Sequence, residues 1–301
     1  MLHSTGWVKF HVVFGRLKVV PGQPRIHQQV QRADPSGMRD ESLAVDVQHG
    51  ATEASYLLDS PQERVSLECH ATGQLLFRCE QKQGPRRIVE LSQPATGPLR
   101  LVVETDSRRV FETDNLWSLA LVEPEMCDNY LAPALQRALP ALRVTEMRGQ
   151  VVSELFRLSR ESRPCRQRVE ELVGELGAKR YSTRQHAEAD LKSLGPGVLP
   201  FIQQIPERHL DAEQRQRIER IRRHYHVNAP DCCERVAAWL ASRPTTWLAL
   251  MRDEEPMRRK LAYAALCASC GEQRTLEFHP SGDHDLRRRQ LDKLHSQLAT
   301  N

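Results

Sequence analysis

Four side chains near the C-terminus are of the types that bind zinc. They are Cys267, Cys270, His279 and His284, which form the pattern C-x2-C-x8-H-x4-H. Structural zinc takes four thiolate or imidazole ligands in a tetrahedron. The gap before the first histidine is shorter than the roughly twelve residues typical of a zinc finger. Both cysteines also fall inside a predicted amphipathic helix, where they would pack as small apolar side chains. We therefore expect packing rather than metal binding, and no other cofactor.

The densest group of cations lies on a helix predicted over residues 212–226. It contains five arginines: Arg215, Arg217, Arg220, Arg222 and Arg223. Cations at this density can neutralise phosphates and release counterions, which favours nucleic acid. The segment lacks interleaved exposed aromatic side chains for base stacking, and Glu213 and Glu219 are spaced to pair with the arginines. We interpret the arginines as a solvated helix face that contacts a partner protein. A nucleic-acid-binding module at 212–226 is the alternative hypothesis.

Local motifs of catalysis are absent from the sequence. It contains no G-x-S-x-G, no Walker loop, no dinucleotide-binding glycine pattern and no H-E-x-x-H. The 39 aspartates and glutamates include no pair set apart by an apolar environment. Catalytic residues can also assemble from distant positions, which a motif search does not see. On the motifs, we predict that the chain is not an enzyme.

Size and composition indicate two compact domains and a reducing compartment. The 301 residues are 40% hydrophobic, which is enough to build cores, and the net charge of +4 is only weak evidence for nucleic acid. No apolar run approaches the roughly 20 residues of a membrane span. Lys9, Arg16 and Lys18 interrupt the first twenty residues, so we expect no signal peptide. The eight cysteines are then expected to be reduced, in a cytoplasmic protein that binds no membrane.

Residues 51–122 are predicted to form a small antiparallel β domain. Apolar residues alternate along 65–69 and 75–79, on either side of a turn at 71–74, which predicts a hairpin. Val110-Phe111 and Leu119-Leu121 are candidates for additional strands. The interleaved arginines and glutamates are typical of a sheet that leaves one face to solvent.

Residues 1–50 give the weakest signals. Val8, Phe10, Val12 and Phe14 alternate with other residues and hint at a strand. Residues 21–50 are polar and rich in glutamine, proline and glycine. We predict a poorly ordered arm or linker for 1–50.

From residue 125 onward the apolar spacing becomes helical, which predicts an all-α domain over 125–301. The clearest stripe consists of Val169, Leu172, Val173 and Leu176. Two pairs have the spacing of a capping box and predict helix starts: Asp211 with Gln214, and Asp231 with Glu234. Trp239 and Trp247 are predicted to anchor the core, and the adjacent Cys232 and Cys233 to pack in it.

The strongest pattern in this region is an internal match. The motif R-x-x-A-x-A-x-L runs from Arg184 to Leu191 and again, 75 positions later, from Arg259 to Leu266. Alanine at a helix contact lets the neighbouring axis approach to about 8 Å, and the leading arginine can reach the preceding turn or a carboxylate. Leu176 corresponds to Met251, and a downstream R-x-x-[I/L]-x-x-[I/L] begins at Arg215 and at Arg288. One helix pair cannot bury its apolar face alone, so neighbouring pairs must stack.

This pattern resembles HEAT-like α-helical repeats, over roughly residues 166–298. In that family the second helix commonly begins with an arginine and turns an alanine and a leucine inward. The matching residues here are Arg184, Ala187 and Leu191, and Arg259, Ala262 and Leu266. A HEAT unit usually has about 40–47 residues, and the period here is nearly twice as long. Each block would then hold two degenerate units; a generic helical bundle is the alternative. The resemblance implies an α-solenoid that serves as a non-catalytic protein–protein scaffold.

Overall fold

The computed structural model describes residues 5–33, 38–48, 50–160, 166–225, 229–270 and 277–299. The chain divides into two compact units, Met1–Arg148 and Gly149–Asn301. The first unit is mainly β and the second is helical, which confirms the predicted α+β class. The division lies within a helix, α4 (Val144–Leu158), and not at the predicted boundary near residue 122.

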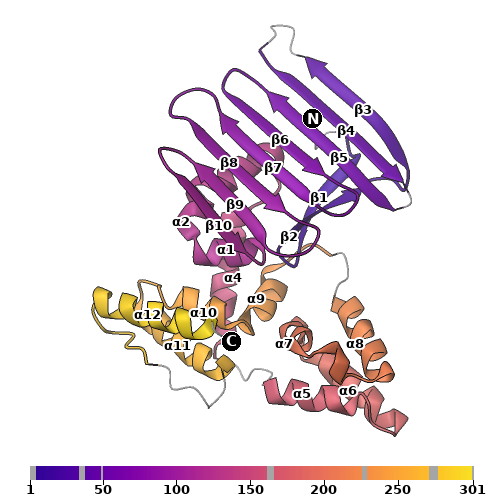
Figure 1. Cartoon of the computed structure of the whole chain (residues 1–301), viewed down its shortest axis with the longest axis vertical. Helices are drawn as coiled ribbons and strands as arrows, with labels where there is room; N and C mark the ends of the chain where they lie inside the picture. The colour runs from indigo at the N-terminus through magenta and orange to yellow at the C-terminus, as the bar shows by residue number, and fades with distance from the viewer. Residues whose placement is uncertain are drawn as a thin grey trace. The chain divides into compact units, whose positions relative to one another are not determined.

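The first unit is built on an eight-stranded antiparallel sheet in which each strand pairs with the next along the chain (Figure 1). Its strands are β3 (Ile26–Ala33), β4 (Asp40–Gln48), β5 (Ala51–Asp59), β6 (Glu63–Cys69), β7 (Leu75–Gln81), β8 (Arg87–Gln93), β9 (Leu99–Glu104) and β10 (Arg108–Thr113). A separate hairpin consists of β1 (Val8–Val13) and β2 (Arg16–Pro21). The predicted hairpin at 65–79 is confirmed as β6 and β7, with Leu67 opposite Phe77.

Alternation along most of the strands gives the sheet one apolar face and one mainly polar face. β8 and β9 depart from it, because Ile88 and Val102 are buried on the mainly polar face. Leu67, Phe77, Leu91 and Leu101 lie side by side in register on four neighbouring strands, and each is at most 1% exposed. We call the side that carries them the inner face. The opposite, outer face carries the intervening polar side chains, so the prediction of one solvent-facing side is confirmed.

The sheet is larger than predicted, and the prediction of a poorly ordered arm over residues 1–50 is wrong. Four strands, β1 to β4, lie between Val8 and Gln48. In β4 the buried Leu43, Val45 and Val47 alternate with neighbours that are half-buried or exposed. That two-residue period is present in the sequence, but it lies next to a glutamine-rich segment whose composition suggested disorder. Tertiary pairing in the sheet overrides that composition.

Helical segments and the β1–β2 hairpin cover the inner face. The Gln93 amide on this face accepts from the Leu17 backbone N–H and donates to the Leu17 carbonyl, both at 2.9 Å. The helices are α1 (Leu116–Val122), α2 (Pro124–Met126), the π-helix η1 (Cys127–Leu131) and α3 (Ala132–Ala138). The prediction of a strand at Leu119-Leu121 is wrong. Asn115 caps α1 by accepting from the Ser118 backbone N–H at 2.9 Å, and this capping starts a helix there.

The second unit is all helical in its described residues, as predicted. Besides the part of α4 that follows Arg148, its helices are α5 (Arg166–Glu175), α6 (Tyr181–Ser193), η2 (Pro196–Val198), α7 (Leu199–Gln204), η3 (Glu207–His209), α8 (Ala212–Tyr225), α9 (Cys233–Ala241), α10 (Pro244–Leu250), α11 (Pro256–Cys270) and α12 (His284–Ala299). The predicted stripe on α5 packs against α6 and α8 in one core. Trp239 and Trp247 are buried as predicted, and the Trp247 indole N–H donates to the Ala241 carbonyl at 2.7 Å.

The predicted capping box of Asp211 and Gln214 forms. The Gln214 backbone N–H donates to Asp211 Oδ1 at 2.7 Å, and Gln214 Oε1 accepts from the Asp211 backbone N–H at 2.8 Å. At the predicted pair Asp231 and Glu234, the N-cap position of α9 is Cys232, one residue after Asp231, and the Cys232 side chain makes no capping hydrogen bond. Among the helices that the structure describes, none is long and apolar enough to cross a membrane.

Candidate interaction surfaces

The two matched blocks place equivalent side chains in equivalent environments. Ala187, Leu191, Ala262 and Leu266 are all 0% exposed. Leu176 and Met251, which precede the turn in each block, are also fully buried. The downstream pairs, Ile218 with Ile221 and Leu291 with Leu294, are buried too. The second alanine of the motif is exposed in both blocks, at Ala189 and Ala264. The internal match therefore marks inward-packing positions at its first alanine, its leucine and the flanking apolar residues, but not at its second alanine.

The arginine that begins each motif binds the turn before its helix. Arg184 Nη1 donates to the carbonyls of Ala178 and Lys179 at 2.8 and 2.9 Å. Arg259 Nη1 donates to those of Asp253 and Glu254 at 2.8 and 2.6 Å. In both cases the acceptors lie six and five residues before the arginine. The prediction that this arginine reaches the preceding turn is confirmed. The contact satisfies carbonyl oxygens that follow the end of the previous helix.

A third arginine makes the same contact, which the sequence reasoning missed. Arg235 Nη2 donates to the carbonyls of Ala229, at 2.7 Å, and Pro230, again six and five residues earlier. The signal was present, because Arg235 and Ala238 repeat the R-x-x-A spacing. The longer pattern R-x-x-A-x-A-x-L does not continue, because Leu240 and Ser242 stand where the second alanine and the leucine would be.

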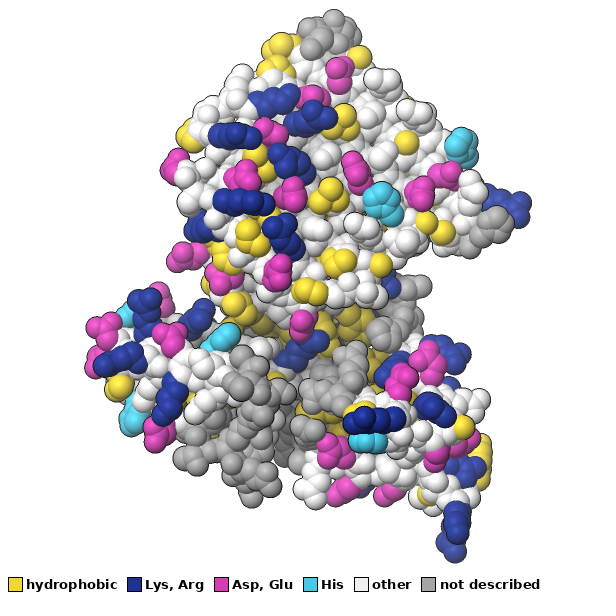
Figure 2. Space-filling model, in the orientation of Figure 1, with side chains coloured by type: hydrophobic (Ala, Val, Ile, Leu, Met, Phe, Trp, Pro, Cys, Tyr) yellow, Lys and Arg dark blue, Asp and Glu magenta, His cyan; other side chains and the backbone are white. Residues whose placement is uncertain are grey.

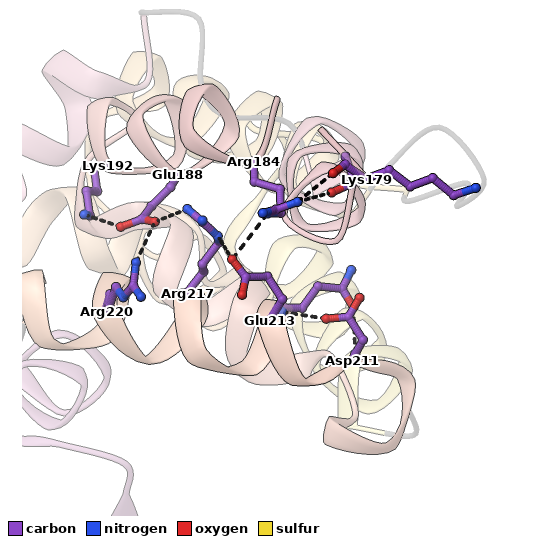
Figure 3. A network of polar contacts seen from close by, with 10 residues as sticks. Lys179, Arg184, Glu188, Lys192, Asp211, Glu213, Arg217 and Arg220 are labelled. Atoms are coloured by element: carbon purple, nitrogen blue, oxygen red, sulfur yellow. Dashed lines mark hydrogen bonds and ion pairs between the residues drawn. The ribbon is translucent and has the colours of Figure 1, made fainter. Parts of the chain in front are cut away.

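The cationic helix α8 is held to α6 by a network of ion pairs (Figure 3). Arg217 lies at its centre with a side chain only 4% exposed. Its Nη1 donates to Glu188 Oε2 on α6 at 2.7 Å, and its Nε donates to Glu213 Oε1 at 2.7 Å. Lys192 Nζ donates to the other Glu188 oxygen at 2.6 Å, and Arg184 Nε lies 3.3 Å from Glu213 Oε1.

Electrostatics in this network favour the charged forms. Burial by itself would lower the pKa of Arg217, but the bonds to Glu213 and Glu188 raise it above its ordinary value. Burial would also raise the pKa of Glu188. The hydrogen bond from Lys192 and the charges of Arg217 and Arg220 outweigh burial and hold that pKa below its ordinary value. The network is a structural link between two helices, because its charges are mutually satisfied.

The five predicted arginines therefore do not form one open patch. Arg217 is inside the unit and cannot contribute to a surface. Arg220 lies 3.9 Å from Glu188, and Arg223 lies 3.5 Å from Glu219. Arg215 is exposed and Arg222 is half-buried. Neither of these two has a carboxylate within 4 Å in the part of the chain that the structure describes, so they are the arginines most available to a partner.

The predicted zinc ligands are only partly described. Cys267 is half-buried on α11, and His284 is exposed at the start of α12. His279 Nδ1 is 2.9 Å from Gln290 Nε2, within hydrogen-bonding distance. The Cys270 side chain lies outside the described residues. Within them, no group of three or more histidine, cysteine or carboxylate side chains is arranged to hold a metal. The prediction of core packing is wrong for Cys232, which is exposed at the start of α9; Cys233 is half-buried.

On the outer face of the sheet, many basic side chains form ion pairs with neighbouring acidic side chains. Figure 2 shows basic and acidic side chains interleaved over the β6–β10 half of this face. Arg78 Nη1 donates to Glu90 Oε2 at 3.1 Å, and Arg108 Nε lies 3.3 Å from Glu104 Oε1. Lys82 pairs with Asp59. Alternating, paired charges give such a face little net attraction for a polyanion.

The outer face also has a shallow, open concavity of about 340 Å³ near the β3–β6 side. His27, His70, Asp46, Glu53 and Glu68 contribute to its lining. His27 Nδ1 lies 3.5 Å from Asp46 Oδ2. Its described lining includes the Ser55 hydroxyl and the Cys69 thiol, and among the described residues neither is hydrogen-bonded to a side-chain base of the kind that activates a nucleophile.

Comparisons with known proteins identify no relative of this chain. No family model matches the sequence, and neither a curated protein nor a solved structure matches it.

Proposed function

We propose that the chain is a non-catalytic protein–protein interaction scaffold whose second unit is a HEAT-like helical repeat domain. The observation that carries this proposal is the equivalence of the two matched blocks. In both, the first alanine and the leucine of the motif are fully buried, and the leading arginine donates hydrogen bonds to turn carbonyls five and six residues earlier. Repeated burial of this kind is how stacked helix pairs build an extended surface.

A protein partner fits the charge arrangement better than nucleic acid does. Phosphate binding needs cations free to replace counterions, and α8 directs its central arginine into the ion-pair network with α6. The exposed side chains of the helical unit carry both signs of charge, which suits the polar rim of a protein interface. A cytoplasmic location is part of the proposal. It is supported by the six cysteines whose side chains the structure describes, all of which are free thiols.

The test is capture of partners from native lysate by the full chain, with and without nuclease, followed by cross-linking and mass spectrometry. We expect at least one specific protein that survives nuclease treatment and cross-links to residues 149–301. Loss of every partner on nuclease treatment would favour the nucleic-acid alternative. Cross-links confined to the β unit would contradict a scaffold built on the helices.

Charge-reversal variants make the test residue-specific. The double variant Arg215→Glu/Arg222→Glu changes the two α8 arginines without a described carboxylate partner. The matched control is Arg64→Glu/Arg86→Glu, which makes the same change in net charge at exposed positions of the β unit. Weaker capture by the first variant and unchanged capture by the control would place the contact on α8.

A further inference from the structure

The strand β3 forms one edge of the eight-stranded sheet (Figure 1). All eight of its residues pair with β4 in unbroken antiparallel register, from Ile26 opposite Val47 to Ala33 opposite Asp40. Among the described residues, no strand pairs with its other side. The strand contains no proline, lysine or bulge, three devices that keep a sheet edge from pairing, and it carries one permanent charge, at Arg32 near its C-terminal end.

Few side chains of β3 are buried. Only Ile26 is buried and Val30 is half-buried, and the other six side chains are exposed. The neighbouring β4 buries four side chains over a similar length. The opposite edge strand, β10, begins with two arginines and is contacted by helix α1. A long, regular strand that is exposed on both faces and along its edge has the properties of an interface.

We propose that β3 pairs with the β3 strand of a second copy of this chain, antiparallel and about a two-fold axis at Val30. In that register Val30 lies opposite the partner's Val30 on the inner face. Gln29 lies opposite the partner's Gln31 on the outer face, and this contact occurs twice. The pairing joins the two sheets into one continuous sheet.

The sequence of β3 suits pairing with itself. Its only permanently charged side chain is Arg32, which would lie opposite the partner's Gln28, and His27 would lie opposite the partner's Ala33. No like charges meet, and the two glutamine pairs can exchange amide hydrogen bonds across the strands. An antiparallel pair of identical strands also closes on itself, because a two-fold axis uses the same edge of both copies.

The pairing should be weak and depend on concentration. A single strand pair buries less than the roughly 1,200 Å² typical of a stable interface. This proposal does not rest on the scaffold function, because it concerns only the β unit and needs no other protein.

Sedimentation velocity of the full chain over a series from low micromolar to several hundred micromolar tests the proposal. We expect a reversible monomer–dimer equilibrium. Gln29→Lys/Gln31→Lys places lysine opposite lysine at both outer-face contacts, and it should raise the dimer Kd by about tenfold or more. Gln29→Lys/Gln31→Glu places lysine opposite glutamate at the same contacts, and it should restore or tighten the dimer.

The control variant is Gln74→Lys/Gln83→Lys, which adds the same charge at exposed turn positions away from β3. It should leave the Kd within about twofold of the wild type. A chain that stays monomeric at every concentration overturns the proposal. The β3 edge would then be available to pair with an extended segment of a different protein. A dimer that responds equally to the β3 and control variants also overturns it.

Discussion

Replacing Arg217 by methionine tests whether the ion pairs between α6 and α8 stabilise the helical unit. The Arg217 side chain is 4% exposed and that of Glu188 is 11% exposed, with 2.7 Å between the paired atoms. Breaking a buried ion pair by removing one partner costs about 3–5 kcal/mol. Glu188 keeps Lys192 at 2.6 Å and Arg220 at 3.9 Å in the variant. We therefore expect a smaller loss, about 2–3 kcal/mol in the free energy of unfolding.

The loss should depend on pH, because Glu188 has a lowered pKa in the folded chain. A carboxyl of this kind stabilises the fold at pH values above its unfolded pKa. That stabilisation disappears as the pH falls through the folded pKa. The difference between the wild type and Arg217→Met should be full at neutral pH and should shrink below about pH 4.

Urea unfolding followed by the helical circular dichroism signal measures both effects. The matched control is Arg223→Met on the same helix, whose side chain is 70% exposed and lies 3.5 Å from Glu219. An exposed pair of this kind contributes about 0–1 kcal/mol. If Arg217→Met costs no more than Arg223→Met at neutral pH, the α6–α8 network does not stabilise the unit and the reasoning fails.

Three further predictions concern core packing, the hydrogen bonds from the motif arginines to the preceding turn (called here the arginine clamp), and the accessibility of thiols. Leu191→Ala and Leu266→Ala should each lower the free energy of unfolding by about 2–5 kcal/mol, because both side chains are fully buried; near-zero losses in chemical denaturation would show that these faces are wet. Arg259→Lys should cost about 1–3 kcal/mol in the same assay, because lysine lacks the fork that reaches two turn carbonyls and the Pro280 carbonyl together; a neutral result would mean that the clamp does not contribute. With a thiol reagent at mildly alkaline pH, Cys232 should react in the folded chain and Cys127 only after unfolding, because burial raises the pKa of Cys127 to about 12; mass spectrometry that finds Cys127 labelled at the rate of Cys232 would contradict the fold of the β unit.

The sequence predicts elements whose signals are local. The 65–79 hairpin, the stripe on α5 and the Asp211 capping box each depend on residues within a few positions of one another. The strands β3 and β4 were missed because β3 has only one buried residue, and its polar composition resembles that of a linker. β3 forms a strand because it pairs with β4, and the sequence of β3 alone does not show that β4 offers it a pairing partner.

The surface was harder to predict than the core. Five arginines on one helix look alike in the sequence, yet Arg217 is buried against Glu188, which lies 29 positions earlier on α6. Helical spacing puts Arg217 near Glu213, and nothing local indicates Glu188. The motif arginines were predictable because their acceptors lie five and six residues away, within the preceding turn.

The strand order of the sheet has a consequence for its dynamics. Each strand pairs with its neighbour in the chain from β3 to β10, so the sheet forms from contacts that are close in sequence, and such contacts favour rapid folding. The same order makes β3 a terminal member attached through one partner and anchored by one buried side chain. We expect its amide hydrogens to exchange first when the sheet opens, because little apolar contact opposes its separation from β4.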